Sequence, residues 1–266
     1  MTLRTPCVAG QFYPSSRSAL KAYLQETIVS DDHKKDAYAV IMPHAGYMYS
    51  GATAAKTISR VNIPQTVFML GPNHTGLGEP FSIMTNGSWI TPLGQVSIDE
   101  ELAEKVVRQS SLIEEDDVAH KKEHSLEVEL PFLQHVRPDV NIVPMAIGSH
   151  DLHKLREVAE AIGSLLMEYN VLILVSSDMT HYESEQQASE KDRKAIDAII
   201  RLDEKMLAAV VAQHNISMCG FAPAYMALIM AKIMGAQSGE LVEYTTSGAV
   251  TGDTAQVVGY AGMIIV

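Results

Sequence analysis

The stretch VLILVSSDMTH, residues 171–181, is an apolar run that passes directly into polar side chains. Four further apolar runs of strand length occur along the chain, and amphipathic stretches separate several of them. This alternation is typical of βαβ units around a largely parallel sheet. Because the runs are almost continuously apolar, helices should cover both faces of the strands. The other four runs are AYAVIM (37–42), TVFMLG (66–71), VNIVPMAIG (140–148) and VVGYAGMIIV (257–266).

The stretches between the runs carry helical and turn signals. Helical periodicity predicts helices at 99–110, 151–169, 188–211 and about 221–234. Asn86-Gly87 lies between alternating runs and predicts a β-hairpin within residues 81–98, at one edge of the sheet. With no linker-like segment, we expect a single α/β domain over residues 1–266, with a largely parallel central sheet flanked by helices.

The composition narrows the class of protein. A chain of 266 residues, 47% of them hydrophobic, can bury a sizeable core, and its formal charge of -12 disfavours a nucleic-acid partner. Its two cysteines, Cys7 and Cys219, fit free thiols in a reducing compartment. No apolar stretch approaches the roughly 20 residues of a membrane span, and the N-terminus has no signal-like apolar core. We therefore expect a soluble cytoplasmic protein without a membrane partner, and the sequence leaves its oligomeric state open.

Three of the apolar runs end in a histidine. His44, His74 and His181 follow the runs at 37–42, 66–71 and 171–177. Open α/β sheets bind ligands at the carboxyl ends of their strands, where these imidazoles would converge. One such histidine is more often structural, but three together favour a site for iron, zinc or copper.

Other residues carry weaker signals. Cys219 precedes a predicted helix, whose dipole would favour a thiolate, although a small buried core residue is an equal alternative. EHSLEVEL (123–130) should open an amphipathic helix with His124 and Glu127 on one face, either serving a pocket or forming a plain helical turn. Cys7 has no such setting. The histidines expected at the surface are His120, His135, His150, His153 and His214.

Several common catalytic motifs are missing from the sequence. It contains no Walker loop, G-x-G-x-x-G, G-x-S-x-G or H-E-x-x-H motif. This removes the commonest nucleotide-binding, serine-hydrolase and zinc-protease interpretations, which strengthens the metal-site hypothesis.

Several ordered motifs across nearly the whole chain resemble the Memo family, whose bacterial and archaeal members are also described as protein B of the AmmeMemoRadiSam system. The motifs are AGQFYP (9–14), PHAGYMYSG (43–51), LGPNH (70–74), EHSLEVELPFL (123–133), VSSDMTHY (175–182) and MCG (218–220). The resemblance implies a fold related to the class III extradiol dioxygenases, which hold non-haem Fe(II) with two histidines and a carboxylate and cleave catechol-type rings.

The resemblance also implies a set of site residues. It places metal ligands at His44, His74 and Cys219, with Asp178 and His181 beside them. The cysteine departs from the dioxygenase pattern, and because a thiolate alters charge and redox behaviour at the metal, ring cleavage does not simply carry across.

The functional expectation is a metal-dependent oxidoreductase, or a dioxygenase-related activity, on a small aromatic or other polar organic molecule. Iron ranks ahead of copper and zinc as the metal. His181 is the expected acid/base residue, with Asp178 orienting it or bonding to substrate and His124 as a second candidate. The alternatives are a non-catalytic binding or scaffold protein that retains the ancestral pocket and, with less weight, a zinc-dependent hydrolase.

Overall fold

All five apolar runs form strands of one sheet in the computed structural model, which describes residues 2–29 and 33–266. Nearly every residue of these strands is buried, which explains why their sequences do not alternate between apolar and polar. The five strands are β2 (Ala39–Met42), β3 (Thr66–Pro72), β8 (Asn141–Ile147), β9 (Val171–Ser176) and β12 (Val257–Ile265).

The centre of the sheet is parallel. β9 pairs in parallel with both β2 and β3, and β3 pairs in parallel with β8. β12 then runs antiparallel to β2 at one side. The expected α/β class with a largely parallel sheet is therefore confirmed, with an antiparallel addition at that side.

Seven further strands complete the sheet among the described residues. Its main path runs β1-β5-β6-β8-β3-β9-β2-β12-β10, while β11 pairs with β12, and β4 pairs with β7 and β8. The additional strands are β1 (Leu3–Arg4), β4 (Phe81–Ile83), β5 (Ser88–Thr91), β6 (Gly94–Ile98), β7 (Glu114–Glu115), β10 (His181–Glu183) and β11 (Gly239–Thr246).

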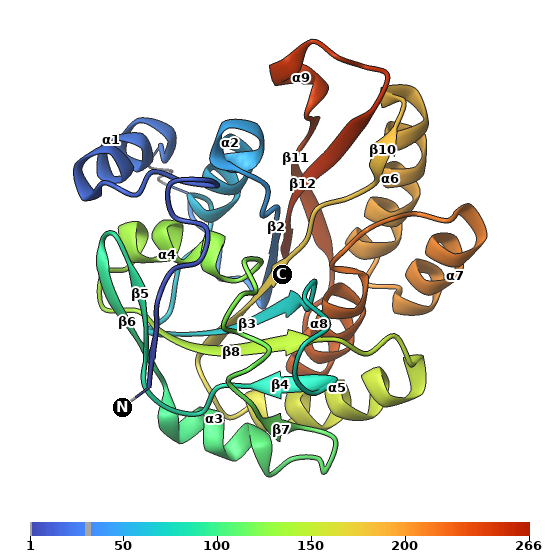
Figure 1. Cartoon of the computed structure of the whole chain (residues 1–266). Helices are drawn as coiled ribbons and strands as arrows, with labels where there is room; N and C mark the ends of the chain where they lie inside the picture. The colour runs from blue at the N-terminus through green and yellow to red at the C-terminus, as the bar shows by residue number, and fades with distance from the viewer. Residues whose placement is uncertain (1, 30–32) are drawn as a thin grey trace.

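Helices cover the sheet on both faces. Figure 1 shows α1, α2 and α4 together on one side of the sheet, and α3, α5 and α8 on the other. α8 packs between α5 and the central strands, which explains why it is apolar almost all round. The helices are α1 (Arg17–Thr27), α2 (Tyr47–Ile58), α3 (Glu100–Val107), α4 (Leu130–Val136), α5 (Leu152–Leu166), α6 (Glu185–Ile200), α7 (Glu204–His214), α8 (Phe221–Met234) and α9 (Gly248–Thr251).

The helix expected at 188–211 is two helices, so that prediction was wrong in its continuity. α6 ends at Ile200, and Leu202 adopts a left-handed backbone with φ 54°. The side chain of Asp203 then accepts a hydrogen bond from the backbone N–H of Met206 and begins α7. Capping by Asp203 therefore interrupts a stretch whose apolar periodicity is otherwise helical.

The expected hairpin exists, but Asn86-Gly87 is not its turn. β4 pairs with β7 and β8, whereas β5 pairs with β6 through a turn between Thr91 and Gly94. Gly87 has φ +93° and simply joins β4 to β5. The Asn-Gly signal thus correctly predicted a change of chain direction, but it assigned that turn to the wrong pair of strands.

The helix predicted to open at 123–130 starts later and is not amphipathic there. Residues 127–129 form a single 3-10 turn (Glu127–Glu129), and α4 begins at Leu130. Glu127 and Glu129 are fully buried, as are the apolar residues beside them. The segment lies in the protein interior, where Glu127 pairs with Arg4 and one oxygen of Glu129 contacts Ser176.

Two glycines allow close approach near the carboxyl ends of the strands. A Cβ on Gly71 would lie 2.7 Å from Oγ of Ser125, and one on Gly220 would lie 2.3 Å from Cβ of Ser177. These contacts bring the segments around Ser125 and Cys219 directly against the ends of β3 and β9. No helix in residues 2–29 and 33–266 is long and apolar enough to cross a membrane.

Candidate metal centre

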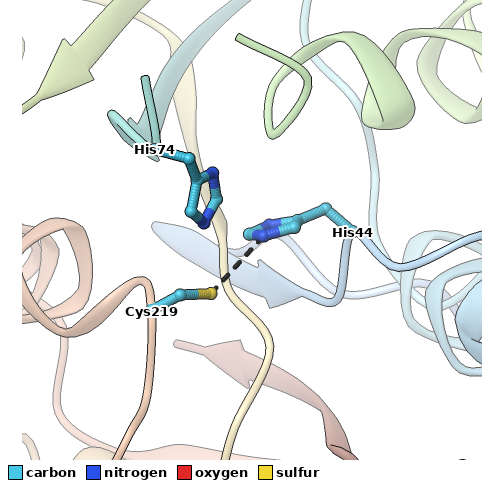
Figure 2. A group of neighbouring side chains, drawn as sticks. All are labelled: His44, His74 and Cys219. Carbon is cyan, nitrogen blue, oxygen red and sulfur yellow. Dashed lines mark hydrogen bonds between the residues drawn. The ribbon is translucent and has the colours of Figure 1, made fainter. Parts of the chain in front are cut away.

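His44, His74 and Cys219 meet at the carboxyl ends of neighbouring strands. His44 follows β2, His74 follows β3, and Cys219 precedes α8. One ligand atom from each residue lies within 4.8 Å of the other two, and Figure 2 shows both rings and the sulfur pointing toward one another. Nε2 of His44 and Sγ of Cys219 are 3.4 Å apart. Two imidazoles and a sulfur so arranged form a donor set that suits iron, copper or zinc.

His44 is held rigidly at this position. Its ring nitrogen Nδ1 is 2.7 Å from Oγ of Ser176, and its backbone N–H donates to Oδ1 of Asp178 at 2.9 Å. Burial lowers the pKa of His44 well below its usual value, and the neighbouring His74 and His124 lower it further. The imidazole is therefore neutral at pH 7, which is the form that binds a metal.

Glu123 orients His74. Its Oε1 lies 2.9 Å from Nδ1 of His74 and also accepts backbone N–H bonds from His124 and Ser125. Its Oε2 accepts the backbone N–H of His74. Burial alone would raise the pKa of Glu123, but the hydrogen bond and charge of His74 and the backbone N–H bonds outweigh it and bring the pKa to about 2. With the ionised Glu123 carboxylate hydrogen-bonded to Nδ1 of His74, Nε2 of that ring is left to bind a metal.

Glu123 was missed in the sequence because its partner His74 is 49 residues away. Glu123, His74 and His124 also place ligand atoms within 4.8 Å of one another. However, four N–H groups already occupy the Glu123 carboxylate, so it is better suited to orient His74 than to bind an ion.

The surroundings of Cys219 favour the neutral thiol over the thiolate. Its Sγ accepts the backbone N–H of Asp178 at 3.2 Å. Although part of the residue remains exposed, the protein atoms packed around the thiol raise its pKa, and the carboxylate of Asp178 raises it further. Burial and Asp178 therefore outweigh the effect of the α8 N-terminus, which was expected to favour a thiolate. A bound cation would supply the missing positive charge.

A cavity of about 520 Å³ opens beside the candidate ligands His44 and His74, which both line it. Asp178 and His181 were expected near the site, and both line this cavity, as does His124. Aromatic side chains form much of the remaining wall: Phe12, Tyr49, Tyr182 and Tyr260. The cavity is large enough for a small organic molecule next to the metal position.

His181 and His124 present their rings to the cavity in different ways. Nδ1 of His181 donates to the carbonyl oxygen of Ser217 at 3.0 Å, which leaves Nε2 as the basic nitrogen. The ring of His124 stacks on His74 with centroids 4.8 Å apart, and burial lowers its pKa. His181 is consequently the better placed general base of the two.

Asp178 lines the cavity, but its observed hydrogen bond goes to the backbone of His44. Burial raises the pKa of Asp178 to about 6. This bond links the Asp178 side chain to the segment after β2. The charge of the Asp178 carboxyl therefore affects the candidate ligand His44 as well as His181.

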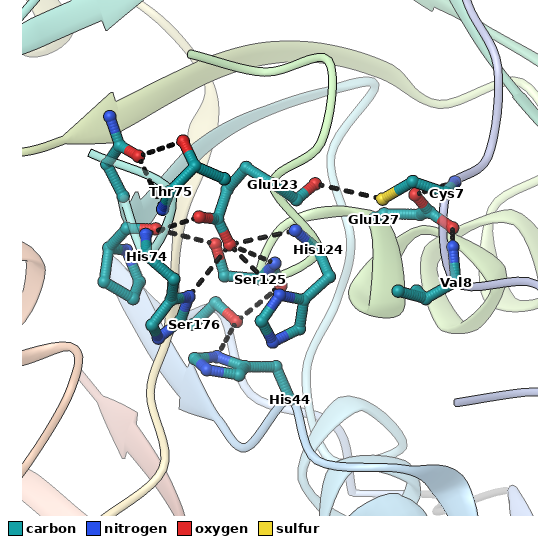
Figure 3. A network of polar contacts seen from close by, with 12 residues as sticks. Cys7, Val8, His44, His74, Thr75, Glu123, His124, Ser125, Glu127 and Ser176 are labelled. Atoms are coloured by element: carbon teal, nitrogen blue, oxygen red, sulfur yellow. Dashed lines mark hydrogen bonds and ion pairs between the residues drawn. The ribbon is translucent and has the colours of Figure 1, made fainter. Parts of the chain in front are cut away.

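The structure decides between the two alternatives for Glu127 and corrects the expectation for His120. Glu127 does not reach the cavity; its carboxylate pairs with Arg4 and accepts the backbone N–H groups of Cys7 and Val8, as Figure 3 shows in part. It fastens the N-terminal segment to the loop that carries Glu123. His120 is fully buried instead of lying at the surface, and burial lowers its pKa to about 4.

The expectations for Cys7 and for the other four surface histidines agree with their surroundings in the structure. Burial raises the pKa of the Cys7 thiol to about 11, which disfavours the reactive thiolate. His150 and His153 are exposed, and His135 and His214 are partly exposed.

The fold and this cluster define an α/β protein with a candidate metal site of two histidines and one cysteine at the carboxyl ends of its central strands. The chain belongs to the Memo-like protein family, whose model matches residues 4–264. This confirms the resemblance seen in the ordered motifs.

Full-length relatives support the assignment. A MEMO1 family protein of Methanopyrus kandleri is 43% identical over 277 residues, covering 98% of each chain. One from Aquifex aeolicus is 42% identical and covers 99% of each chain. The crystal structure of an uncharacterized protein from Escherichia coli K12 aligns with a TM-score of 0.52 at 12% identity, covering 85% of this chain and 98% of that one. That last likeness concerns the fold alone.

The raised pKa of Asp178 predicts how stability depends on pH in the metal-free protein. Because the fold favours the protonated carboxyl of Asp178, its ionisation should lower the free energy of unfolding as pH rises from about 4 through about 6. Asp178→Asn cannot ionise and keeps an acceptor for the His44 N–H, so at pH 7.5 it should be about 1–3 kcal/mol more stable than wild type. Urea unfolding with a chelator at pH 4.5 and 7.5 measures the difference, which should shrink at the lower pH.

Asp139→Asn is the matched control. Its hydrogen bond from Arg137 lowers the pKa of Asp139, so this substitution should not stabilise the protein at pH 7.5. An Asp178→Asn variant no more stable than wild type at pH 7.5 contradicts the assigned environment.

Proposed function

We propose that this protein is a metal-dependent oxidoreductase related to the dioxygenases, acting on a small organic molecule. The observation that carries the proposal is the convergence of ligand atoms from His44, His74 and Cys219 within 4.8 Å, beside a cavity of about 520 Å³. A purely structural cluster would not need an open cavity beside it. Iron is the favoured metal, ahead of copper and zinc, because two imidazoles and a thiolate suit all three and the resemblance adds weight to iron.

The chemistry of the donor set fits a bound metal. His44 and His74 each have Nδ1 engaged by a protein oxygen, so each can turn Nε2 toward the ion. The Cys219 sulfur faces Nε2 of His44. When bound, a redox-active metal at these residues supplies electron transfer with oxygen or substrate.

The cavity supports a reaction with proton transfer. Nε2 of His181 is the acceptor nitrogen because Nδ1 donates to Ser217, so His181 can take a proton from a substrate in the cavity. The aromatic walls exclude water from part of the space and would hold a flat or partly apolar substrate. We further propose a cytoplasmic setting, because both cysteines are free thiols.

Replacing the sulfur tests the metal site. Cys219→Ser is nearly isosteric but offers a poor soft ligand, so affinity for the metal should fall at least about tenfold, equal to about 1.4 kcal/mol. Metal affinity of the wild type should also fall as pH is lowered, because the thiol must lose a proton to bind. Chelator competition and elemental analysis, on protein purified without metal-affinity resin, measure both effects.

Alkylation supplies the control for this test. Added metal should protect Cys219 from alkylation, while the half-buried thiol of Cys7, whose pKa is raised, should react at the same rate with or without metal. Unchanged metal content in Cys219→Ser, with alkylation indifferent to metal, would return Cys219 to the role of a core residue.

Replacing the proposed base separates catalysis from metal binding. His181→Ala should keep metal affinity within about threefold and lose oxygen consumption with catechols or thiols, since its ring lines the cavity outside the three-ligand cluster. His153→Ala, an exposed histidine, is the matched control and should behave as wild type. Loss of metal from His181→Ala would make it a ligand. A metal-loaded wild type that consumes no oxygen with these compounds would favour a binding or scaffold role.

A further inference from the structure

A fully buried polar group lies behind His44, on the side away from the cavity. Ser176, the last residue of β9, and Glu129, in the turn before α4, are both buried completely. Oγ of Ser176 is 2.7 Å from Nδ1 of His44, 2.7 Å from the carbonyl oxygen of Ser125 and 3.1 Å from Oε1 of Glu129. Figure 3 shows Ser176 between His44 and the Ser125 segment.

Counting protons decides which atoms donate in this group. A serine hydroxyl has one proton, and the carbonyl oxygen of Ser125 can only accept, so the Ser176 proton belongs in the short bond to Ser125. Oγ of Ser176 must then accept from its other neighbours. Nδ1 of His44 therefore carries a proton and donates it to Ser176, and Nε2 of His44 carries the lone pair.

The same count applies to Glu129. Ser176 has no second proton to give, so the contact at 3.1 Å is a hydrogen bond only if Glu129 is a neutral carboxylic acid that donates. Its other oxygen, Oε2, is buried and has no hydrogen-bond partner. An ionised carboxylate there would be a buried charge without a compensating bond on one oxygen, which is far costlier than a neutral acid. Burial also raises the pKa of Glu129 well above its usual value.

We propose that Ser176, supported by neutral Glu129, is the positioning residue that fixes the tautomer of His44 with Nδ1 protonated and the Nε2 lone pair directed at the metal position. The two histidines are thus held by different means: His74 by the ionised carboxylate of Glu123, and His44 by a neutral hydroxyl and acid. The inference rests on the proposed metal site for its consequence, but the tautomer itself is a property of the metal-free protein.

The direct test is the ring tautomer of His44 in metal-free wild-type protein at pH 7.5. Two-bond ¹H–¹⁵N correlation spectra distinguish a protonated Nδ1 from a protonated Nε2, with His44→Asn used to assign the signal. The expected result is protonated Nδ1, although imidazole in water prefers the other tautomer. A protonated Nε2 overturns the proposal whether or not any metal binds.

Affinity for Zn²⁺, measured by chelator competition, tests the consequence. Ser176→Ala should weaken binding about 10-fold to 100-fold, because the His44 proton loses its acceptor. Glu129→Gln keeps a neutral donor and should stay within about threefold of wild type, whereas Glu129→Leu should lose more. Ser82→Ala removes another fully buried serine, whose hydroxyl lies beside the carbonyl oxygen of Glu79 and Oδ2 of Asp116, and should leave both tautomer and affinity unchanged.

The outcomes separate this inference from the proposed function. Wild-type protein that binds neither Zn²⁺ nor Fe²⁺ would refute the metal site, while the spectrum would still decide the tautomer. Metal binding with unchanged affinity in Ser176→Ala would refute the positioning role alone. Equal losses in Glu129→Gln and Glu129→Leu would show that Glu129 acts through a negative charge, which contradicts the proposal.

Discussion

Parallel pairing of β9 with both β2 and β3 is the constraint on which the candidate site depends. Because these three strands run in the same direction, their carboxyl ends open at one edge. His44 and His74 follow two of them, and Ser176 and Asp178 come from the end of the third. α8 then brings Cys219 to the same place, since Gly220 lets its first turn approach the end of β9 closely. A change of pairing order would separate every one of these groups.

Hydrogen bonds to the far side of each histidine ring fix the orientation of the candidate ligands and the charges around them. The carboxylate of Glu123 holds Nδ1 of His74, and the hydroxyl of Ser176 holds Nδ1 of His44. Both rings consequently offer Nε2 to the same space. Burial and Asp178 both oppose ionisation of the Cys219 thiol, and a bound cation would favour it. Metal binding and proton release are therefore coupled at this sulfur.

Much of the sheet could be predicted from the sequence because its strands are buried on both faces and read as continuous apolar runs. The same reasoning failed where a local signal competed with periodicity, as at Asp203, which caps α7 and divides an expected single helix. α2 was missed because its buried face is built of small residues such as Ala54 and Thr53, which carry weak apolar periodicity. The first histidines after the strands could be picked out because strand ends are ligand sites in this architecture.

The groups behind the ligands could not be found in the same way. Glu123 contacts His74 across 49 residues, and Glu129 contacts Ser176 across 47, so neither pair has a spacing that a sequence motif can show. Glu127 was chosen from the same segment by its helical spacing, yet the segment is a tight turn and directs that carboxylate to Arg4. Long-range pairing in the folded chain decides which carboxylate of EHSLEVE serves the site.

X-ray absorption spectroscopy of the iron- or zinc-loaded protein tests the central claim most directly, because it counts and identifies the atoms bound to the metal. The account predicts one sulfur at about 2.3 Å together with imidazole nitrogens at about 2.0–2.1 Å for zinc, and a comparable sulfur contribution for iron. A metal surrounded only by nitrogen and oxygen would contradict a site built from His44, His74 and Cys219.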